Sequence, residues 1–366
     1  MECLGTPTCP WQAYGSAVLQ RVDLNLEPNE ASDLCQVHEP GLLAAQGWDA
    51  SFLTVLDEAP VEDAIVMLGH DAGASPTEGW STYRLRFDAG EDACRSDDAE
   101  VVTVRADGWV YALGSHYGAK SGPLEPKRQW IARFHHGALA GGLEGARPPL
   151  EVVRTKFRLH RAVNDALAAA DIALFDVGPH AREALIDATR RDGQQRSKRW
   201  VERVRPDDAP INIEGATFLP DDKLLLGLRF PTSADGHPLL VEVADIDVLF
   251  DGGTPECGPV WSLEVGSRER PLGVRAMSGE HIIVGSLDAR GKDSVLLADH
   301  PEAGEAGCSH WRRAPLPAGG GTVGATLVHD FGDLRKVEGV ADGIDGHHLY
   351  VVDEESGVQM RFLLLE

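Results

Sequence analysis

A short pattern centred on a glutamate recurs along the chain, and its spacing limits the folds that the chain can adopt. The three clearest copies join a polar residue, a small or aliphatic residue, a glutamate and a short apolar run: DAEVVTV (98–104), NIEGATF (212–218) and KVEGVAD (336–342). A fourth copy at 271–274 carries Leu272 in place of the glutamate, and a looser fifth copy lies at 39–42. Repetition on this scale indicates a fold built from several copies of one small unit.

The four better copies are each followed by a turn rich in glycine or acidic residues, and then by a second apolar run that ends in a polar residue. Asp107-Gly108 and Asp345-Gly346 are two of these turns, and glycine supplies the positive φ that a tight hairpin requires. The final polar residue lies 15 or 16 positions after the glutamate: Glu100 to His116, Glu214 to Arg229, Leu272 to Asp288, and Glu338 to Asp353. A hairpin folded at its midpoint brings both positions to the same end of a sheet.

The copies begin near positions 40, 100, 214, 272 and 338, so one interval is about twice as long as the others. Six units of about 60 residues would fill the chain, and this period predicts an all-β fold, a β-propeller. We favour six blades, with five or seven as alternatives. The 40 glycines and 22 prolines suit short strands and frequent turns. The runs at 17–26 and 358–365 are expected to pair and close the ring.

The long interval contains the least β-like stretch of the sequence. Residues 161–170 and 179–189 carry alanine and leucine at helical spacing and predict short helices, with a strand at 172–177 between them. We therefore expect a single propeller domain over 1–366 with a partly helical insertion at 155–205.

The net charge of the chain excludes some classes of binding partner. A formal net charge of −24 argues against nucleic acid, which needs a basic surface, and against anionic membranes. The basic run at 190–205 is interpreted as a solvated insertion, with a binding arm for an acidic partner as the alternative. No apolar run is long enough to span a membrane and no signal peptide is visible, so a cytoplasmic location is expected.

The six cysteines are far apart and form no CxxC pair, so free thiols are expected instead of a zinc site. A disulfide between Cys3 and Cys9 is the alternative in an oxidising compartment.

Three glutamates of the repeat are the first candidates for a functional site. Glu100, Glu214 and Glu338 begin inner strands of three blades, so their carboxylates can face one another around the channel mouth. With Asp353 they form a candidate calcium site, because Ca²⁺ prefers carboxylate oxygens. They are also candidate acid–base groups, since adjacent carboxylates raise one another's pKa values. The structural alternative is that each bonds a neighbouring strand or channel water.

His116 and Arg229 are placed beside Glu100 and Glu214 by the hairpin argument. The planar fork of an arginine suits a carboxylate or phosphate, although a salt bridge between Arg229 and Glu214 is an equal alternative. We predict that Glu100, His116, Glu214 and Arg229 are catalytic and contact a small anionic or ester-bearing ligand.

Other suggestive motifs carry less weight. Ser115 and His116 are adjacent on a strand and point to opposite faces, so they cannot form a dyad. The same objection applies to the pairs His135-His136 and His347-His348 as joint metal ligands. The glycine-rich segment at 319–324 matches GxGxxG, but prolines precede it where a strand is required, so it is interpreted as a loop.

The segments NIEGATFLP and LLLGLRFP, at 212–220 and 224–231, and YALGSH at 111–116 resemble a bacterial β-propeller family. That family is similar to the phytase-like and "esterase-like" propellers, and the resemblance covers about a quarter of the chain. It implies the fold, whereas activity must be argued from the site itself.

Two functions remain open from the sequence. The first is a hydrolase-like enzyme that acts on a small ester or phosphate-bearing substrate at the channel mouth, with calcium as a candidate cofactor. The second is a non-catalytic propeller that presents its loops to a protein partner. The first predicts that the polar repeat positions converge in one pocket, and the second that they are individually paired.

Overall fold

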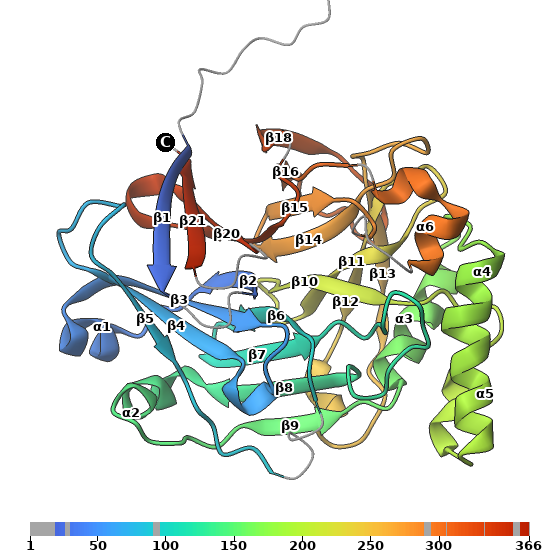
Figure 1. Cartoon of the computed structure of the whole chain (residues 1–366), viewed down its shortest axis with the longest axis horizontal. Coiled ribbons are helices and arrows are strands. Elements are labelled where there is room, and N and C mark those ends of the chain that lie inside the picture. The colour runs from blue at the N-terminus through green and yellow to red at the C-terminus, as the bar shows by residue number, and fades with distance from the viewer. Residues whose placement is uncertain are drawn as a thin grey trace, which may run out of the picture.

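A computed structural model describes residues 19–25, 30–90, 96–288, 294–304, 306–332, 334–353 and 359–365. The described strands form five sheets, each an antiparallel array of four strands, one of which gains a short parallel strand (Figure 1). The first two sheets are β2 (Ala31–Gln36), β3 (Trp48–Leu56), β4 (Ile65–Asp71), β5 (Trp80–Arg84), and β6 (Ala99–Val104), β7 (Trp109–Gly114), β8 (Trp130–His135), β9 (Glu151–Arg154).

The other three sheets follow the same plan. The third sheet contains β10 (Asn212–Phe218), β11 (Leu224–Thr232), β12 (Pro238–Val243) and β13 (Cys257–Leu263), with β17 (Gly321–Val323) added at its edge. The fourth contains β14 (Gly273–Ser278), β15 (His281–Gly285), β16 (Ser309–Arg313) and β18 (Ala325–Asp330). The fifth contains β19 (Val337–Asp342), β20 (His348–Val352), β21 (Gln359–Leu365) and β1 (Leu19–Asn25).

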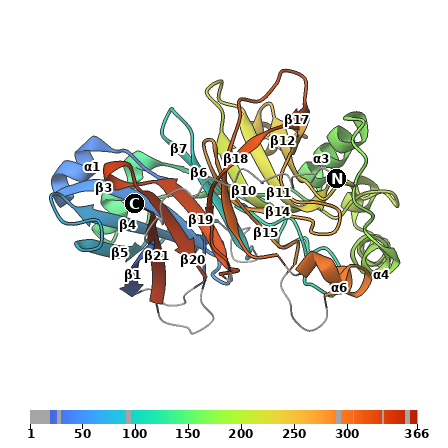
Figure 2. The ribbon, with the colours of Figure 1, turned by 90° about the horizontal axis from the view of Figure 1, so that it is seen from above.

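The inner strands of the five sheets form a closed ring. Contacts run from β2 to β6, β10, β14 and β19 in turn, and β19 contacts β2 again. Figure 2 shows β10, β14 and β19 near the centre of the molecule. Sheets arranged radially around a shared axis make a β-propeller, as the repeat predicted. The described residues supply five such sheets, whereas the repeat spacing favoured six and left five open.

The ring closes through strands from the two ends of the sequence. β1 pairs with β21 in antiparallel register, from Leu19 opposite Leu365 to Asn25 opposite Gln359. The expected pairing of 17–26 with 358–365 is therefore confirmed. β19, β20 and β21 of this sheet follow one another in the sequence, and β1 comes from the opposite end of the chain.

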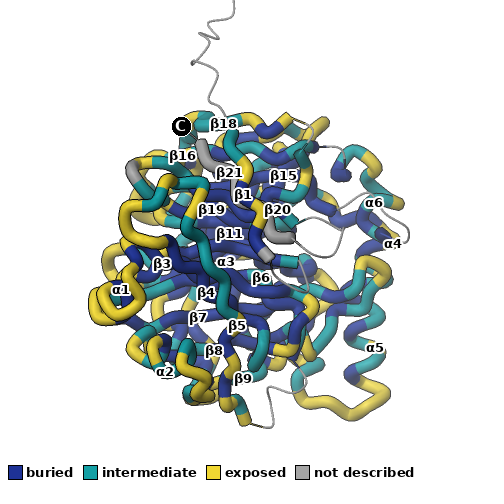
Figure 3. Tube along the Cα trace, turned by 60° about the vertical axis from the view of Figure 1, so that its left-hand side comes forward, coloured by how far each residue is buried: buried dark blue, intermediate teal, exposed yellow. Residues whose placement is uncertain are grey.

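Glycine in the Glu-Gly repeat lets neighbouring inner strands approach closely. A Cβ atom at Gly215 would lie 2.8 Å from Cγ of Met277 on β14, and one at Gly339 would lie 3.0 Å from the carbonyl carbon of Asp33 on β2. Larger residues at these positions would push the sheets apart. Buried apolar residues form separate clusters between the sheets, and Figure 3 shows β4, β6 and β11 as largely buried.

The long interval between β9 and β10 contains helices in place of a further sheet. They are α3 (Arg158–Ala169), α4 (Pro179–Ala181), a π-helical turn (Arg182–Asp187), α5 (Ala188–Gln195) and a 3₁₀ helix (Arg199–Arg203). α4 and α5 lie outside the ring, at the right of Figures 1 and 2. The predicted helices at 161–170 and 179–189 are confirmed. The predicted strand at 172–177 is wrong, since only one isolated bridge forms, between Leu174 and Ser233.

The remaining helices are short connections between strands. They are α1 (Pro40–Gln46), α2 (Leu139–Leu143), α6 (Val295–Asp299) and 3₁₀ helices at Val61–Asp63, His136–Ala138, Ile246–Leu249, Pro301–Gly304 and Ile344–Gly346. The loose repeat copy at 39–42 is the start of α1, where the Glu39 carboxylate caps the backbone N–H groups of Gly41 and Leu42. That copy is therefore not a strand.

No helix in the described ranges is both long and apolar enough to cross a membrane. Cys35, Cys257 and Cys308 are free thiols, as expected. Cys3, Cys9 and Cys94 lie outside the described residues.

A candidate active site at the channel mouth

The charged residues of the repeat sit at bulges in the inner strands. The neighbours of Glu100 pair with two consecutive residues of β7, so Glu100 itself has no partner opposite, and the same holds for Glu214 and Glu338. In β14 the bulged residue is Arg275, which corrects the alignment that placed Leu272 there. A bulge re-aims the side chain of its extra residue. This geometry explains why the repeat places a charged residue at this position.

These four bulged residues line one cavity of about 530 Å³. Arg229 and Asp353 also line it, so five of the six residues predicted for the site share the cavity, and His116 is the exception. The other charged residues of the wall are Glu30, Asp57, Glu58, Asp98, Lys120, Arg128, Asp288, Arg335 and Lys336. We call this space the channel-mouth cavity. Its size suits a small-molecule ligand.

A buried ion-pair network forms one side of the channel-mouth cavity. Arg275 lies between two glutamates: its Nη1 atom is 3.2 Å from Oε2 of Glu214, and its Nη2 contacts Oε1 of Glu338. The side chains of Arg275 and Glu214 are only 6% and 5% exposed. Three inner strands, β10, β14 and β19, are thereby tied together by charge. Removing one member of such a network leaves a buried charge unpaired.

Arg229 completes the same network from β11. Its Nη1 atom donates to Oε1 of Glu214 at 2.6 Å, and its Nε donates to the carbonyl oxygen of Ser286 at 3.2 Å. Asn212 donates to the same glutamate oxygen at 3.1 Å. The predicted side-by-side placement of Glu214 and Arg229 is therefore observed. The Nη2 atom of Arg229 makes no bond with any residue that the structure describes.

Glu100 differs from Glu214 and Glu338, the other two glutamates of the repeat, because its carboxyl group has no partner among the described residues. It is half-buried, and it forms neither a hydrogen bond nor an ion pair with the described residues. Burial raises the pKa of Glu100 well above its ordinary value, and the charges of Glu214, Asp98 and Asp57 raise it further, against the opposing effect of Arg275. A carboxyl group in this environment keeps its proton to a higher pH than an ordinary glutamate does, and it can donate that proton.

Asp98 lies two residues before Glu100 in the sequence, and two partners stabilise its ionised form. Arg128 Nη1 is 2.7 Å from Oδ1 of Asp98, and the Ser115 hydroxyl donates to Oδ2. Burial raises the pKa of Asp98 to about 6, and Arg128 and Ser115 limit that rise. Asp98 is therefore mostly ionised at pH 7, whereas the pKa of Glu100 is raised well above its ordinary value. Neighbouring carboxyl groups whose environments separate their pKa values are the usual arrangement for acid–base chemistry.

The expected contact between Glu100 and His116 does not form. The bulge at Glu100 shifts the register by one residue, so that Asp98, not Glu100, meets the end of β7 at Ser115. His116 is fully buried, with a left-handed φ of 60° and its Nδ1 atom 2.8 Å from the carbonyl oxygen of Gly114. Burial lowers the pKa of His116 to about 4, so the ring is neutral at pH 7. Its position outside the cavity leaves it without direct access to a ligand.

A second carboxyl pair, Glu30 and Asp57, lies in the wall of the same cavity. Burial raises the pKa of Asp57 to about 8, and a hydrogen bond with Glu30 adds to the effect. Burial also raises the pKa of Glu30. The pair therefore shares a proton at neutral pH. Asp353 is close by and is paired with Lys336 Nζ at 2.7 Å.

The calcium site expected from Glu100, Glu214, Glu338 and Asp353 remains a prediction. Within the described residues these four carboxylates do not form a group with ligand atoms close enough to share one ion. Arg275 lies between Glu214 and Glu338, and Lys336 is bound to Asp353. Among the described acidic residues of the cavity wall, Glu30, Asp57, Glu58 and Glu100 form no ion pair with a basic side chain.

Several residues of the site were not predicted from the sequence. Arg275 was hidden because the repeat was aligned on Pro271-Leu272, whereas the bulge lies at Arg275. Glu30 and Asp57 precede or follow strands and belong to no repeated pattern. Asp98 is the polar residue that opens the copy of the repeat at 98–104, so a signal was available for it.

No family model matches the chain, and no curated protein matches it. Among solved structures, it is similar to a putative oxidoreductase (glucose dehydrogenase) from Thermus thermophilus, with 12% identity, a TM-score of 0.37, and coverage of 95% of this chain and 100% of that one. It is also similar to a GH43 endo-arabinanase from Bacillus licheniformis, with 10% identity, a TM-score of 0.37, and coverage of 92% of this chain and 94% of that one. A putative gluconolactonase is similar as well, with 11% identity, a TM-score of 0.34, and coverage of 94% of this chain and 92% of that one.

Similarity at this level carries no information about the activity or substrate of this chain. The similarity to phytase-like propellers is not confirmed by these structures. The β-propeller fold follows from the closed ring of sheets itself.

Proposed function

We propose that the channel-mouth cavity is the active site of a hydrolase-like enzyme that acts on a small ester or phosphate-bearing substrate. The observation that carries this proposal is the unpaired carboxyl group of Glu100, which lines the cavity and has a strongly raised pKa. A protonated buried carboxyl group without a partner costs stability, and such a cost is common at catalytic positions.

The reaction that fits these residues is general acid–base hydrolysis. Asp98, held by Arg128 and Ser115, takes a proton from water while the water oxygen bonds to the acyl carbon or phosphorus. The ester bond then breaks, and Glu100 gives its proton to the leaving oxygen. Each proton transfer of this kind contributes about 10²–10⁴ in rate. The free Nη2 atom of Arg229 is the donor for an anionic oxygen of the substrate.

A second candidate function, a non-catalytic scaffold for a protein partner, is favoured by the ion pairs. Glu214, Glu338 and Asp353 are each paired with a basic side chain, as a purely structural role requires. Glu100 is the residue that this role does not explain.

Hydrolysis of p-nitrophenyl esters, p-nitrophenyl phosphate and lactones by wild type, Glu100→Gln and Asp98→Asn distinguishes the two functions. We expect turnover of one substrate class by wild type, and a loss of about 10²–10⁴ in each variant. Glu256→Gln, at an exposed position outside the cavity, is the matched control. Turnover that persists in a folded Glu100→Gln protein contradicts the assignment, and a screen without turnover favours the scaffold.

A further inference from the structure

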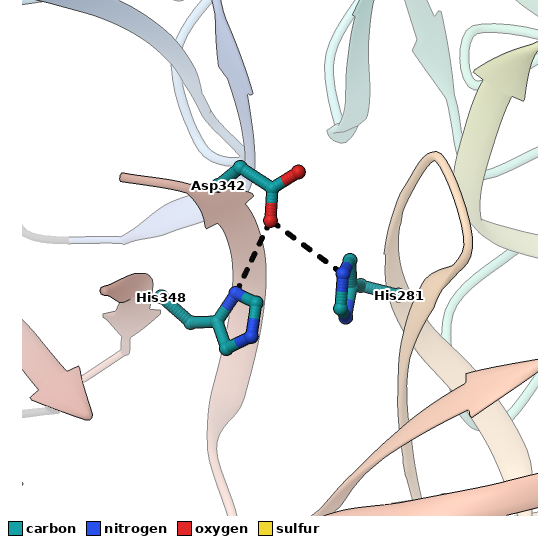
Figure 4. Close-up of side chains that lie close together, drawn as sticks. All are labelled: His281, Asp342 and His348. Carbon is teal, nitrogen blue, oxygen red and sulfur yellow. Dashed lines mark ion pairs between the residues drawn. The ribbon is translucent and has the colours of Figure 1, made fainter. Parts of the chain in front are cut away.

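A histidine cluster lies between two sheets, away from the channel-mouth cavity. His281 begins β15, His348 begins β20, and Asp342 ends β19. Figure 4 shows both imidazole rings directed at the same carboxylate. Oδ1 of Asp342 is 3.5 Å from Nε2 of His281 and 3.2 Å from Nδ1 of His348, and all three ligand atoms lie within 4.8 Å of one another. Glu338, at the other end of β19, lines the channel-mouth cavity, so the two sites are distinct.

A second layer of hydrogen bonds orients His281. Its Nδ1 atom is 2.9 Å from Nε2 of His310, and Nδ1 of His310 is 2.7 Å from the hydroxyl of Tyr350. If each ring donates along this chain towards Tyr350, Nε2 of His281 carries a lone pair that faces Asp342. Metal-binding histidines are usually held in this way, because a bond at the second nitrogen fixes the tautomer and the ring orientation.

One buried ring nitrogen of the cluster makes no hydrogen bond with a described residue. Nδ1 of His348 is buried, and despite its distance of 3.2 Å from Asp342 it makes no hydrogen bond with a described residue. Two imidazole nitrogens and one carboxylate oxygen thus converge from three strand ends, and no described side chain outside the cluster donates a hydrogen bond to these three atoms. His347, the sequence neighbour of His348, is not part of the group, which agrees with the expectation that adjacent residues on a strand do not bind one ion jointly.

We propose that His281, Asp342 and His348 bind one divalent transition-metal ion, with Zn²⁺ as the best match. Imidazole and carboxylate ligands suit Zn²⁺ in a tetrahedral set, and the exposed side of Asp342 leaves the fourth position to water. The ion joins the sheet of β14, β15, β16 and β18 to the sheet closed by β1 and β21. It therefore secures the sheet whose strands come from opposite ends of the sequence.

Titration of the chelator-treated full-length protein with ZnCl₂ tests this proposal, with calorimetry for affinity and Co²⁺ absorption for ligand geometry. We expect one ion per chain, a tetrahedral Co²⁺ spectrum, and loss of both in His281→Gln and Asp342→Asn. The second variant changes an exposed side chain, 71% accessible, so it keeps the test valid if the first fails to fold. Tyr350→Phe is expected to weaken binding by about 10–100-fold, as loss of an outer hydrogen bond does.

The matched control is His180→Gln, which removes an exposed imidazole paired with Asp299 at 2.5 Å. Equal Zn²⁺ affinity in wild type, His281→Gln and Asp342→Asn would show adventitious surface binding and overturn the proposal, as would the absence of any ordered Co²⁺ spectrum in wild type.

A basic cleft lies between the helical insertion and the loop at 123–127, separate from the histidine cluster. This cleft of about 880 Å³ is lined by eight basic residues and two acidic ones: Lys127, Arg154, Lys156, Arg158, Arg196, Lys198, Arg199, Arg203, Glu125 and Asp192. Lys127 is paired with Asp97 and Glu125, and Arg196 with Asp192. The other six basic residues form no ion pair with any described residue.

This concentration of unpaired cations is unexpected in a chain with a net charge of −24. Burial and the neighbouring charge of Arg158 lower the pKa of Arg203, and Nε of Arg154 is buried without a hydrogen bond. Trp200, packed on Phe157 with ring centroids 4.7 Å apart, adds an aromatic wall. Crowded like charges are unfavourable unless an anion neutralises them.

We infer that the basic cleft binds a small phosphorylated molecule with an apolar or aromatic body. Pyrophosphate and ATP are the probes, with binding measured by calorimetry at low and high salt. We expect saturable binding that weakens with salt and is lost in Arg154→Gln and in Lys156→Gln/Lys198→Gln, while Arg312→Gln, an exposed position elsewhere, behaves as wild type. Binding that is unchanged in both cleft variants, or no binding of either probe, overturns the inference.

Discussion

Nη1 of Arg229 lies 2.6 Å from Oε1 of Glu214, and the same carboxylate is bound on its other oxygen by Arg275. One buried glutamate thus organises two arginines from neighbouring sheets. The pairing determines which hydrogen-bond donors of each arginine remain available to a ligand. Because the same bonds stabilise the fold, variants of these residues can be tested by stability as well as by activity.

Arg229→Lys keeps the positive charge but loses the planar fork. We expect the free energy of unfolding to fall by about 1.5–3 kcal/mol, the usual contribution of a hydrogen bond to a charged group. Urea denaturation measures this change, with Arg312→Lys as the exposed control. In the hydrolysis assay the variant should also lose substrate affinity, because lysine cannot bond to Glu214 and an anion in the same geometry. Undiminished binding and turnover would exclude a recognition role.

Arg275→Met should be the more damaging change. It leaves Glu214 with one arginine and Glu338 with none, and breaking a buried pair costs about 3–5 kcal/mol. The double variant Arg275→Met/Glu338→Gln should recover part of that loss, because the second change removes the uncompensated charge. Equal stability of the single and double variants would show that Arg275 does not act through Glu338.

Asp57 should make the protein less stable as the pH rises. Folding raises its pKa from 3.8 to about 8, so between these values the unfolded chain has lost a proton that the folded protein still holds. The stabilising contribution is complete below pH 3.8 and is lost as the pH approaches 8.

Asp57→Asn removes this dependence. Relative to wild type, the variant should gain more than about 1 kcal/mol between pH 4 and pH 8, since one pKa unit corresponds to about 1.4 kcal/mol. Urea denaturation across this range measures the gain, with exposed Asp251→Asn as control. Parallel stability profiles for wild type and Asp57→Asn would mean that Asp57 titrates normally.

Calcium is expected to leave the thermal midpoint unchanged at about 10 mM, a concentration above the dissociation constants of even weak protein sites, which reach about 10⁻³ M. The reason is that Arg275 and Lys336 already neutralise three of the four carboxylates proposed as ligands. Melting curves in calcium and in chelator test this expectation. A clear rise in the midpoint that Glu100→Gln abolishes would restore the calcium site.

The repeat predicted the fold because each blade repeats one physical requirement. An inner strand must pack closely beside its neighbours, which calls for small residues such as Gly215 and Gly339, and it must turn a bulged residue into the channel. The small residue and the bulged residue therefore recur at fixed positions of the repeat. The number of sheets was harder to predict, since helices of the insertion lengthen the interval between Glu100 and Glu214 to about twice the others.

The site was predictable only as far as strand register allowed. Glu214 and Arg229 meet because the bulge and the hairpin length together bring them side by side. Glu100 and His116 fail to meet although their spacing is similar, because Ser115 and Asp98 take that contact and His116 turns into the core. A shift of one residue reverses the direction of a side chain, and spacing alone does not reveal it.

The central claim is that the environment of Glu100 raises its pKa so that it can act as an acid, and the titration of Glu100 tests this most directly. Carboxyl ¹³C NMR of wild type and Glu100→Gln identifies the resonance of Glu100 and follows it with pH. The account predicts a midpoint well above the ordinary glutamate value of 4.5. A midpoint at or below 4.5 would contradict it, because an ionised Glu100 could not protonate a leaving group.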